Sequence, residues 1–354
     1  MGELEAMVRV GIIGASGYAG AELVRYLLGH PGARISYVAS ETYSGKPLAD
    51  AFPSFLGQEL PDCEPYDAEI AADRCDLVFQ AQGNGVGMKL APELLEFGKK
   101  LIDIPADFRL KEPAQYKHYY GIEHTAPDLA AEAVYGIPEI HGAEIASARL
   151  VANPGCYAAS AIIALAPLVS AGLVESKSIV IDSKSGVSGA GRSKLDVSGL
   201  FCEVNEGFKA YAVGSHRHTP EIEQELSRLA GESITVCFTP HLVPMNRGIL
   251  TTAYGRAAGR VASTAELIGV YREFYAGKPF VVVLDEGAQP NTKNVFGTNF
   301  CHVGAVLDKR AERVVITCAI DNMGKGAAGQ AIQNMNLMCG FDEATGLTSP
   351  AVYP

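Results

Sequence analysis

The pattern of hydrophobic and polar positions begins as a strand, a glycine-rich turn, a helix and a second strand. Residues 8–13 (VRVGII) form a short apolar run, and Gly14–Gly20 (GASGYAG) follows it. Leucine and valine then recur at helical spacing until Gly29 ends the helix, and residues 35–40 (ISYVAS) form the next apolar run. This order is typical of the start of a doubly wound parallel sheet. Further strands of that sheet are predicted at 76–81, 100–104 and 149–153.

The pattern changes after Gly155. Apolar runs now follow one another with fewer helices between them, at 178–183, 235–240, 249–255, 280–285, 302–308 and 313–320. Thr219-Pro220-Glu221 predicts a helix start, and Ser263 with Glu266 forms a capping box. Many strands with few helices predict a mixed, largely antiparallel sheet. The segment 327–338 (AAGQAIQNMNLM) predicts a final amphipathic helix.

Length and composition limit the kind of protein. The chain has 354 residues, which favours two domains, and at 48% hydrophobic it can bury a substantial core. Its net charge of −11 and its lack of a dense Lys/Arg cluster argue against nucleic acid as a partner. The uncharged stretch 150–174 is mostly alanine and contains prolines and glycines, so we interpret it as a buried loop and helix and expect no membrane association.

The first residues of the sequence and the spacing of its cysteines favour an intracellular protein. The start of the sequence (MGELEAMVRVG) lacks a cationic segment followed by an apolar core, so we predict no export signal. The eight cysteines are scattered and form no C-x-x-C pair, which gives no support for a metal site. We therefore expect a cytoplasmic protein with reduced thiols and no bound metal.

The glycine turn is the first candidate site. Glycines at 14, 17 and 20 allow the backbone to approach a pyrophosphate, and the following helix offers its N-terminal N–H groups. We predict a dinucleotide site there, although this spacing differs from G-x-G-x-x-G and does not by itself specify the cofactor.

A cysteine follows the last predicted strand of the first sheet. In Asn153-Pro154-Gly155-Cys156-Tyr157 the turn places Cys156 at the start of a helix. The positive end of the helix dipole lowers a thiol pKa, and the same N–H groups can hold an oxyanion. We predict Cys156 as a nucleophile.

Two further segments complete the candidate chemistry. His216, Arg217 and His218 directly precede a helix, whose positive end is expected to depress a histidine pKa and favour a neutral general base. The loop Asp182–Arg192 contains small residues with a lysine and an arginine, which suits an anion. A thiolate, a base, a nicotinamide site and an anion loop together indicate acyl-phosphate reduction.

Several motifs in order resemble one family almost from end to end: N-acetyl-γ-glutamyl-phosphate reductase of arginine biosynthesis, in its longer form. The motifs are GASGYAGAELVR, ADFRLKEPAQY, NPGCY, DSKSGVSGAGR, HRHTPEIEQEL, FTPHLVPMNRGILTT and NTKNVFGTNFCHVG. The resemblance implies NADPH-dependent reduction of N-acetyl-γ-glutamyl phosphate, a small-molecule substrate, to N-acetylglutamate 5-semialdehyde and phosphate. It also implies a homodimer or homotetramer formed through the second domain.

The resemblance assigns roles residue by residue. Cys156 is expected to form the thioacyl intermediate and His218 to act as acid/base, with His216 as the competing choice for that role. Substrate contacts are expected from Arg109, Ser185, Glu203, His216, Arg217 and Glu221. Cofactor contacts are expected from Gly14, Ser16, Gly17, Tyr18, Ala19, Ser40 and Asn322.

The same resemblance implies a split domain layout. The fold class is α/β, with a Rossmann-like doubly wound dinucleotide-binding domain and an α+β domain for substrate and oligomerisation. The first domain is expected to cover 1–155 and 326–354, and the second 156–325.

The segment after the second strand leaves the cofactor open. The family usually has an arginine there, suited to the 2′-phosphate of NADP, whereas this chain reads Ser40-Glu41-Thr42-Tyr43-Ser44-Gly45-Lys46. Glu41 would repel that phosphate and could accept hydrogen bonds from the ribose hydroxyls of NAD. Ser40 and Lys46 still suit a phosphate, so we predict NADP and keep NAD as the alternative.

Two other readings remain. A sibling enzyme could use the same chemistry on another acyl phosphate, such as the aminoadipate-type reductase of lysine synthesis or aspartate-semialdehyde dehydrogenase. A non-catalytic dinucleotide-binding regulator would need the glycine turn but not Cys156, His218 and the anion loop together.

Overall fold

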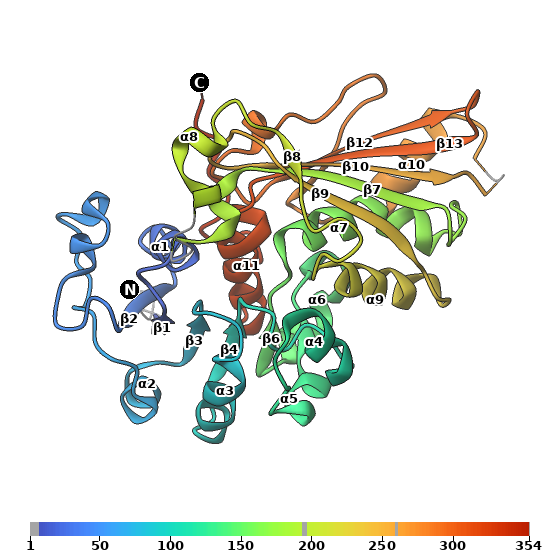
Figure 1. Cartoon of the computed structure of the whole chain (residues 1–354). Coiled ribbons are helices and arrows are strands. Elements are labelled where there is room, and N and C mark those ends of the chain that lie inside the picture. The colour runs from blue at the N-terminus through green and yellow to red at the C-terminus, as the bar shows by residue number, and fades with distance from the viewer. Residues whose placement is uncertain (1–6, 193–196, 259–260, 354) are drawn as a thin grey trace, which may run out of the picture. The chain divides into compact units, whose positions relative to one another are not determined.

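The chain divides into two compact units. The computed structural model describes residues 7–192, 197–258 and 261–353. The first unit comprises Met1–Pro154, Gly191–Ser193 and Ala327–Ser349, and the second comprises Gly155–Ala190, Lys194–Gly326 and Pro350–Pro354. The first unit thus includes two segments that lie far from the rest of it along the chain, as the colours in Figure 1 show.

The first unit is built on a parallel sheet with the strand order β2-β1-β3-β4-β6-β5 (Figure 1). Its strands are β1 (Val8–Ile13), β2 (Ala33–Ala39), β3 (Leu77–Gln80), β4 (Lys100–Asp103), β5 (Val134–Tyr135) and β6 (Leu150–Ala152). The apolar runs that predicted strands correspond to β1, β2, β3, β4 and β6. The runs of β3 and β6 are continuous rather than alternating because these strands are buried at every residue.

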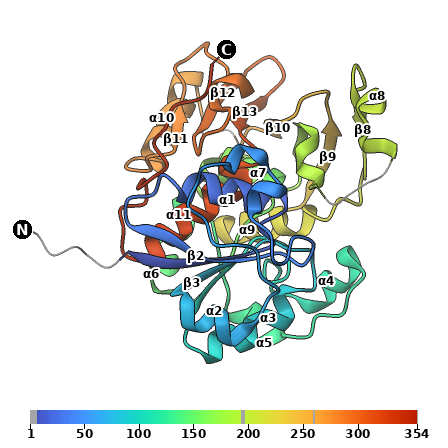
Figure 2. The ribbon, with the colours of Figure 1, turned by 90° about the vertical axis from the view of Figure 1, so that its left-hand side faces the viewer.

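Helices cover both faces of this sheet. They are α1 (Tyr18–Leu27), α2 (Ala68–Arg74), α3 (Gly87–Glu96), α4 (Pro113–Tyr120), α5 (Pro127–Glu132), α6 (Pro138–Ser147) and α11 (Gly329–Met338). Helix α1 packs against α11, and α2 packs against α3 on the opposite face (Figure 2). This arrangement confirms the predicted doubly wound fold.

The turn between β1 and α1 requires its glycines. Gly14 has a φ of +86°, a conformation that residues with a Cβ rarely adopt. A Cβ on Gly20 would lie only 2.6 Å from the Cα of Ala15, so the first turn of α1 can pack against the loop only with glycine there. Gly17 is the N-cap of α1.

The second unit is a mixed sheet with the strand order β11-β12-β13-β10-β7-β9-β8. Its strands are β7 (Ile179–Ser185), β8 (Lys209–Ala210), β9 (Val236–Leu242), β10 (Ile249–Arg256), β11 (Val281–Val283), β12 (Cys301–Asp308) and β13 (Arg313–Ile320). The β7–β9 and β11–β12 pairs are parallel, and the other neighbouring pairs are antiparallel. The predicted mixed, largely antiparallel sheet is confirmed.

Helices pack on one face of this second sheet. They are α7 (Cys156–Ser170), α9 (Thr219–Ala230) and α10 (Thr264–Phe274), while the short α8 (Phe201–Val204) precedes β8. Helix α7 is buried along nearly its whole length and contacts β10, β13 and α9. This helix is the uncharged stretch of the sequence, and among the described residues no helix is long and apolar enough to cross a membrane.

Two helix starts test the predicted caps. Ser263 caps α10 as predicted, because its hydroxyl accepts a hydrogen bond from the N–H of Glu266 at 3.2 Å. Helix α9 begins at Thr219, but its N-cap is His218 and no side chain caps it. Gly231 ends α9 in the left-handed conformation, with a φ of +68°.

The predicted C-terminal helix is confirmed as α11, but its polar residues do not form a solvent-facing side as an amphipathic helix would. Helix α11 is buried on almost every side, including its polar residues. Gln330 and Asn334 both donate to the carbonyl of Gly136, at 2.7 and 3.0 Å, and Asn336 bonds to His30 at 2.9 Å. Amide side chains can be buried when they are hydrogen-bonded, so their polarity did not mark a solvent-facing side.

Two buried carboxyl groups lie at the carboxyl end of β4. Asp107 accepts hydrogen bonds from the N–H of Gly85 at 2.7 Å and from the Tyr116 hydroxyl at 2.7 Å. Asp103 is fully buried, and burial together with the neighbouring Asp107 carboxylate raises its pKa well above the ordinary range, although Arg109 favours the charged form.

This raised pKa predicts a pH-dependent gain in stability for Asp103→Asn. Above the ordinary aspartate pKa the unfolded chain releases its proton while folded Asp103 retains it, so wild type loses stability as the pH rises. At pH 7 the variant should unfold with a higher free energy than wild type, whereas near pH 4 the difference should disappear. Urea titrations followed by circular dichroism measure this difference.

The matched control is Asp107→Asn. That substitution removes the carboxylate that accepts hydrogen bonds from the N–H groups of Gly85 and Met88 and from the Tyr116 hydroxyl, so it should lower stability at pH 7. A gain for Asp103→Asn that is equal at both pH values would contradict the protonated state of Asp103.

Candidate functional site

Cys156 is the first residue of α7, as the sequence predicts. The turn before it is fixed by Glu221 on α9, whose carboxylate accepts a hydrogen bond from the N–H of Gly155 at 2.7 Å. Glu221 is fully buried, whereas Cys156 is partly exposed. Glu221 was predicted to contact substrate. In the structure its carboxylate binds the backbone of the turn that precedes Cys156.

The two histidines lie together where α9 begins. His216 and His218 are each 7% exposed, and their ring centroids are 4.8 Å apart in an edge-to-face arrangement. Nδ1 of His216 accepts a hydrogen bond from the N–H of His218 at 3.1 Å. The pKa of His216 is lowered to about 4, first by burial and then by the positive charge of Arg217. The depression was predicted, but its main cause is burial and not the helix dipole.

Tyr157 and Tyr211 also belong to this cluster, although neither was predicted to have a role. The hydroxyl of Tyr211 donates to the hydroxyl of Tyr157 at 3.2 Å, and Tyr157 donates to the carbonyl of His241 at 2.9 Å. The Tyr157 ring contacts both histidines edge to face. Burial raises the pKa of Tyr157 strongly and that of Tyr211 to about 12, so both phenols are protonated near neutrality. The position of Tyr157 directly after Cys156 in the sequence could have indicated that it belongs to the site. No local sequence feature indicated Tyr211.

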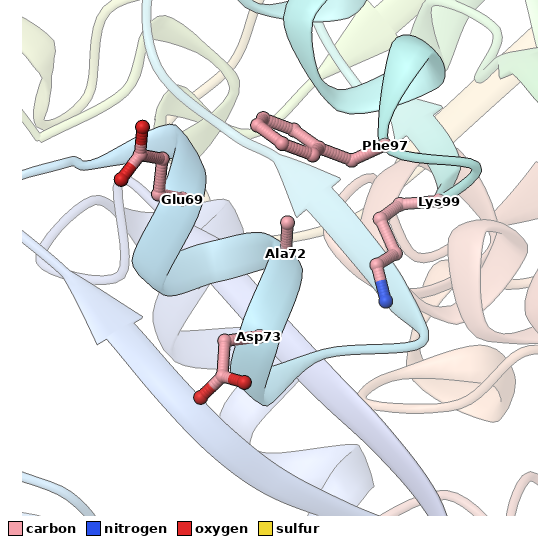
Figure 3. A pocket seen from close by; sticks show the side chains of 5 residues that line it. All are labelled: Glu69, Ala72, Asp73, Phe97 and Lys99. Atoms are coloured by element: carbon pink, nitrogen blue, oxygen red, sulfur yellow. The ribbon is translucent and has the colours of Figure 1, made fainter.

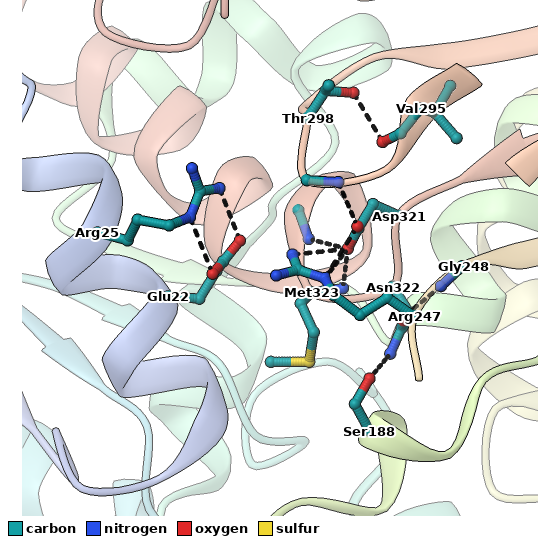
Figure 4. Close-up of polar contacts among 12 residues, drawn as sticks. Glu22, Arg25, Ser188, Arg247, Gly248, Val295, Thr298, Asp321, Asn322 and Met323 are labelled. Atoms are coloured by element: carbon teal, nitrogen blue, oxygen red, sulfur yellow. Dashed lines mark hydrogen bonds and ion pairs between the residues drawn. The ribbon is translucent and has the colours of Figure 1, made fainter. Parts of the chain in front are cut away.

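Ser185 and Asn322 lie in the second unit at the ends of β7 and β13, the two strands that flank the start of β10. Asn322 follows β13, accepts from the N–H of Gly248 at 2.7 Å and donates to the Ser188 hydroxyl at 2.9 Å (Figure 4). Ser185 ends β7 and is 2% exposed. Asn322, predicted to contact cofactor, thus ties the loop after β7 to the start of β10.

The remaining predicted substrate residues differ in exposure. Arg217 is exposed between the two buried histidines, and Glu203 is exposed on α8. Arg109 is buried in the first unit, where its guanidinium donates to the carbonyls of Asn153 at 2.7 Å and Ile104 at 2.6 Å. It therefore orders the segment that leads to Cys156 along the chain.

The predicted cofactor residues of the first unit gather at the carboxyl ends of β1 and β2. Ser16 in the glycine turn and Ser40 after β2 share a hydrogen bond between their hydroxyl oxygens at 2.8 Å. Gly14, Gly17, Tyr18 and Ala19 form the turn and the first residues of α1, with Tyr18 exposed. The chain passes from β1 to β2 on one side and then to β3 on the other, and dinucleotides bind at such a switch point. These residues fit a nicotinamide dinucleotide.

The predicted anion loop does not act as one unit. Lys184 lies within β7 and pairs with Asp182 at 2.6 Å, in the second unit. Arg192, at the other end of the loop, belongs to the first unit and donates to the carbonyl of Ser16 at 3.0 Å. The sequence analysis did not place Arg192 among the cofactor residues, because nothing in its local sequence indicates which unit it joins.

Two pockets in the structure contain none of the predicted site residues. One lies between α2 and the turn after α3 and is lined by Glu69, Ala72, Asp73, Phe97 and Lys99 (Figure 3). The other, in the second unit, is lined by Glu175, Arg256, Ala257, Val261, Ala262, Leu307, Lys309 and Glu312. Both differ in composition from the cysteine and histidine cluster, and neither joins the candidate site.

Comparison with known proteins gives two matching family models. The semialdehyde dehydrogenase NAD-binding domain matches residues 9–148, and the semialdehyde dehydrogenase dimerisation domain matches residues 156–322. Solved structures of similar fold include aspartate semialdehyde dehydrogenase II complexed with ASA from Vibrio cholerae, with a TM-score of 0.72 and 17% identity, covering 94% of this chain and 98% of that one. Aspartate semialdehyde dehydrogenase with NADP from Candida albicans has a TM-score of 0.70 and 18% identity, covering 94% and 99%.

Curated relatives match the whole length. The N-acetyl-gamma-glutamyl-phosphate reductase of Geobacter sulfurreducens is 50% identical over 349 residues, covering 98% of this chain and 100% of the relative. The enzyme of that name from Pelotomaculum thermopropionicum is 52% identical over 347 residues, covering 98% and 99%. The chain belongs to the semialdehyde dehydrogenase family of oxidoreductases and, within it, to the N-acetyl-gamma-glutamyl-phosphate reductases.

Proposed function

We propose that the chain reduces N-acetyl-γ-glutamyl phosphate with NADPH to N-acetylglutamate 5-semialdehyde and phosphate, as a cytoplasmic step of arginine biosynthesis. The observation that carries the proposal is a partly exposed cysteine at the first position of α7, in a unit that also contains the buried histidine pair. Half of the residues are identical to those of reductases of this name, over nearly the full length.

The chain's own residues account for the thiol chemistry. His218 takes the proton from Sγ of Cys156, and the thiolate forms a bond to the acyl carbon while the carbon–oxygen bond to phosphate breaks. The proton passes to the departing phosphate. N–H groups at the start of α7 stabilise the negative oxygen that forms on the acyl carbon. When bound, the nicotinamide cofactor supplies hydride to that carbon, after which the carbon–sulfur bond breaks and the aldehyde leaves.

Cys156→Ser tests this assignment directly. The variant should lose about 1,000-fold or more of the turnover, because serine is a far weaker nucleophile at neutral pH, while binding of the oxidised cofactor is unchanged. The assay runs in reverse, with N-acetylglutamate semialdehyde, inorganic phosphate and either NADP or NAD, and follows absorbance of the reduced nicotinamide. Cys202→Ser, which changes an exposed cysteine on α8, serves as the control.

Each outcome of that assay decides something. Phosphate-dependent reduction of NADP by wild type supports the substrate and the cofactor preference. Activity with NAD alone supports the substrate and rejects NADP. Inactive wild type rejects the substrate, and near-normal rates for Cys156→Ser reject the thioacyl step.

The low pKa of His216 assigns it a neutral role. At pH 7 a histidine with a pKa of about 4 carries no charge, so it can accept a hydrogen bond but holds no proton to donate as a cation. We therefore favour His218 as the acid/base and His216 as the residue that fixes the backbone of the turn through the N–H of His218.

This assignment predicts how stability depends on pH. The folded state binds fewer protons than the unfolded state between the ordinary histidine pKa of about 6.5 and the folded value, so stability is present above pH 6.5 and falls toward pH 4. Over that range wild type should lose about 2 to 3 kcal/mol more than His216→Gln. Urea unfolding at pH 4.5, 5.5 and 7 measures the loss, and parallel curves for both proteins would refute the neutral histidine.

We further propose that two copies associate through the open face of the second sheet. A row of apolar side chains crosses that face on paired positions of adjacent strands, with Val180 and Tyr254 41% and 39% exposed. Residues paired across strands point to the same face. The row comprises Cys237, Val180, Tyr254, Val315 and Val306. The match to a dimerisation domain over these strands supports the proposal.

Tyr254→Arg tests the association. A charge in the middle of the apolar row would have to be desolvated on pairing, so the variant should be a monomer at concentrations where wild type is an oligomer. Light scattering after size-exclusion chromatography gives the mass. Glu273→Arg introduces the same side chain on α10 and should leave the wild-type mass unchanged. An oligomeric Tyr254→Arg protein would exclude this face.

A further inference from the structure

Arg192 is attached to the nucleotide-binding unit, although the chain on both sides of residues 191–193 belongs to the other unit. Its guanidinium donates to the carbonyl of Ser16 at 3.0 Å, to the carbonyl of Ala51 at 3.2 Å and to the hydroxyl of Tyr43 at 3.3 Å. It also lies 4.6 Å from the centroid of the Phe52 ring. Arg192 is thus held by the glycine turn and by the loop after β2 together.

These contacts place the positive charge of Arg192 beyond the carboxyl end of β2, where dinucleotide-binding folds of this class bind the adenosine ribose. The group beyond the carboxyl end of the second strand meets the 2′ position of that ribose. Ser40 directly follows β2, and its hydroxyl is 2.8 Å from that of Ser16, whose carbonyl binds Arg192. The carboxylate of Glu41, the next residue, accepts a hydrogen bond from the N–H of Tyr66 at 3.2 Å.

The guanidinium retains donors for a ligand. A guanidinium has five N–H bonds. The contacts above use one on Nη1 and both on Nη2, so the N–H of Nε and the second N–H of Nη1 have no partner among the described residues. The side chain is half-buried. Arginine binds phosphate through two parallel hydrogen bonds, and the neighbouring serine hydroxyls add further donors.

We propose that Arg192 binds the 2′-phosphate of NADP(H), together with the hydroxyls of Ser16 and Ser40, and so sets the preference for the phosphorylated dinucleotide. The proposal rests on the proposed function and deepens it. The family resemblance predicts an arginine after the second strand, where this chain has none, and Arg192 would supply the missing positive charge. Arg192 performs this role from a segment about 150 residues further along the chain.

The test compares two small probes that differ in the 2′-phosphate. 2′,5′-ADP carries a phosphate at both positions, whereas 5′-AMP lacks the one at the 2′ position. Isothermal titration calorimetry gives Kd for each probe with wild type, Arg192→Gln and Lys46→Ala. Glutamine keeps neutral N–H donors for the carbonyls of Ser16 and Ala51. The variant therefore distinguishes the effect of the positive charge on the ligand from the structural effect of these hydrogen bonds. Lys46→Ala tests the competing cation, because Lys46 is exposed in the loop after β2 and was also expected to suit a phosphate.

Wild type should bind 2′,5′-ADP more tightly than 5′-AMP. Arg192→Gln should weaken binding of 2′,5′-ADP by about 10- to 100-fold and that of 5′-AMP by less than about 3-fold, because only the first probe loses a charge-assisted bond. Arg192→Lys should fall between wild type and Arg192→Gln, because it keeps the charge without the planar fork.

Several results would overturn the proposal. Equal weakening of both probes would make Arg192 a structural clamp, and no weakening of either would remove it from the site. A loss confined to Lys46→Ala would assign the phosphate to Lys46. If wild type prefers 5′-AMP, the 2′-phosphate site is rejected, while the acyl-phosphate reaction can still be assayed with NAD and stand on its own.

Discussion

The candidate active centre depends on one buried hydrogen bond, from the N–H of Gly155 to the carboxylate of Glu221. It joins the turn before α7 to the first turn of α9, and therefore fixes Cys156 relative to the two histidines. A hydrogen bond to a charged acceptor contributes about 1.5 to 3 kcal/mol. Packing between α7 and α9 maintains the low-dielectric surroundings that make this bond strong.

The same burial determines the chemistry of the side chains around the thiol. Burial lowers the pKa of His216 to about 4 and raises the pKa values of Tyr157 and Tyr211 above the ordinary phenol value, so all three favour their uncharged forms. Arg217 is the most exposed member of this group, and Cys156 and Tyr211 are partly exposed. Under the proposed function, the substrate would meet the sulfur of Cys156 and the charge of Arg217 next to the rings of Tyr157 and Tyr211.

In the first unit, polar side chains carry the structure as much as apolar ones. The amides of α11 bond to the backbone of Gly136, and Asn334 also donates to the side chain of Asn153 at 3.1 Å. Gly136 is required there, because a Cβ would lie 2.5 Å from Nδ2 of Asn334. The C-terminal helix therefore holds the strand ends from which Asn153 and the following turn emerge.

The sequence by itself determined the elements and the order of the fold. Apolar runs of strand length, the glycine turn and the cap at Ser263 are local signals, because each depends on residues within one element. The place of Cys156 at a helix start was predictable for the same reason. Tertiary structure decided which polar residues are buried: the amides of α11, the role of Glu221 and the pKa of His216 all depend on partners far away in the chain. It also decided that Arg192 joins the nucleotide-binding unit, because hydrogen bonds to Ser16 and Ala51 form across long separations and leave no periodic trace in the sequence.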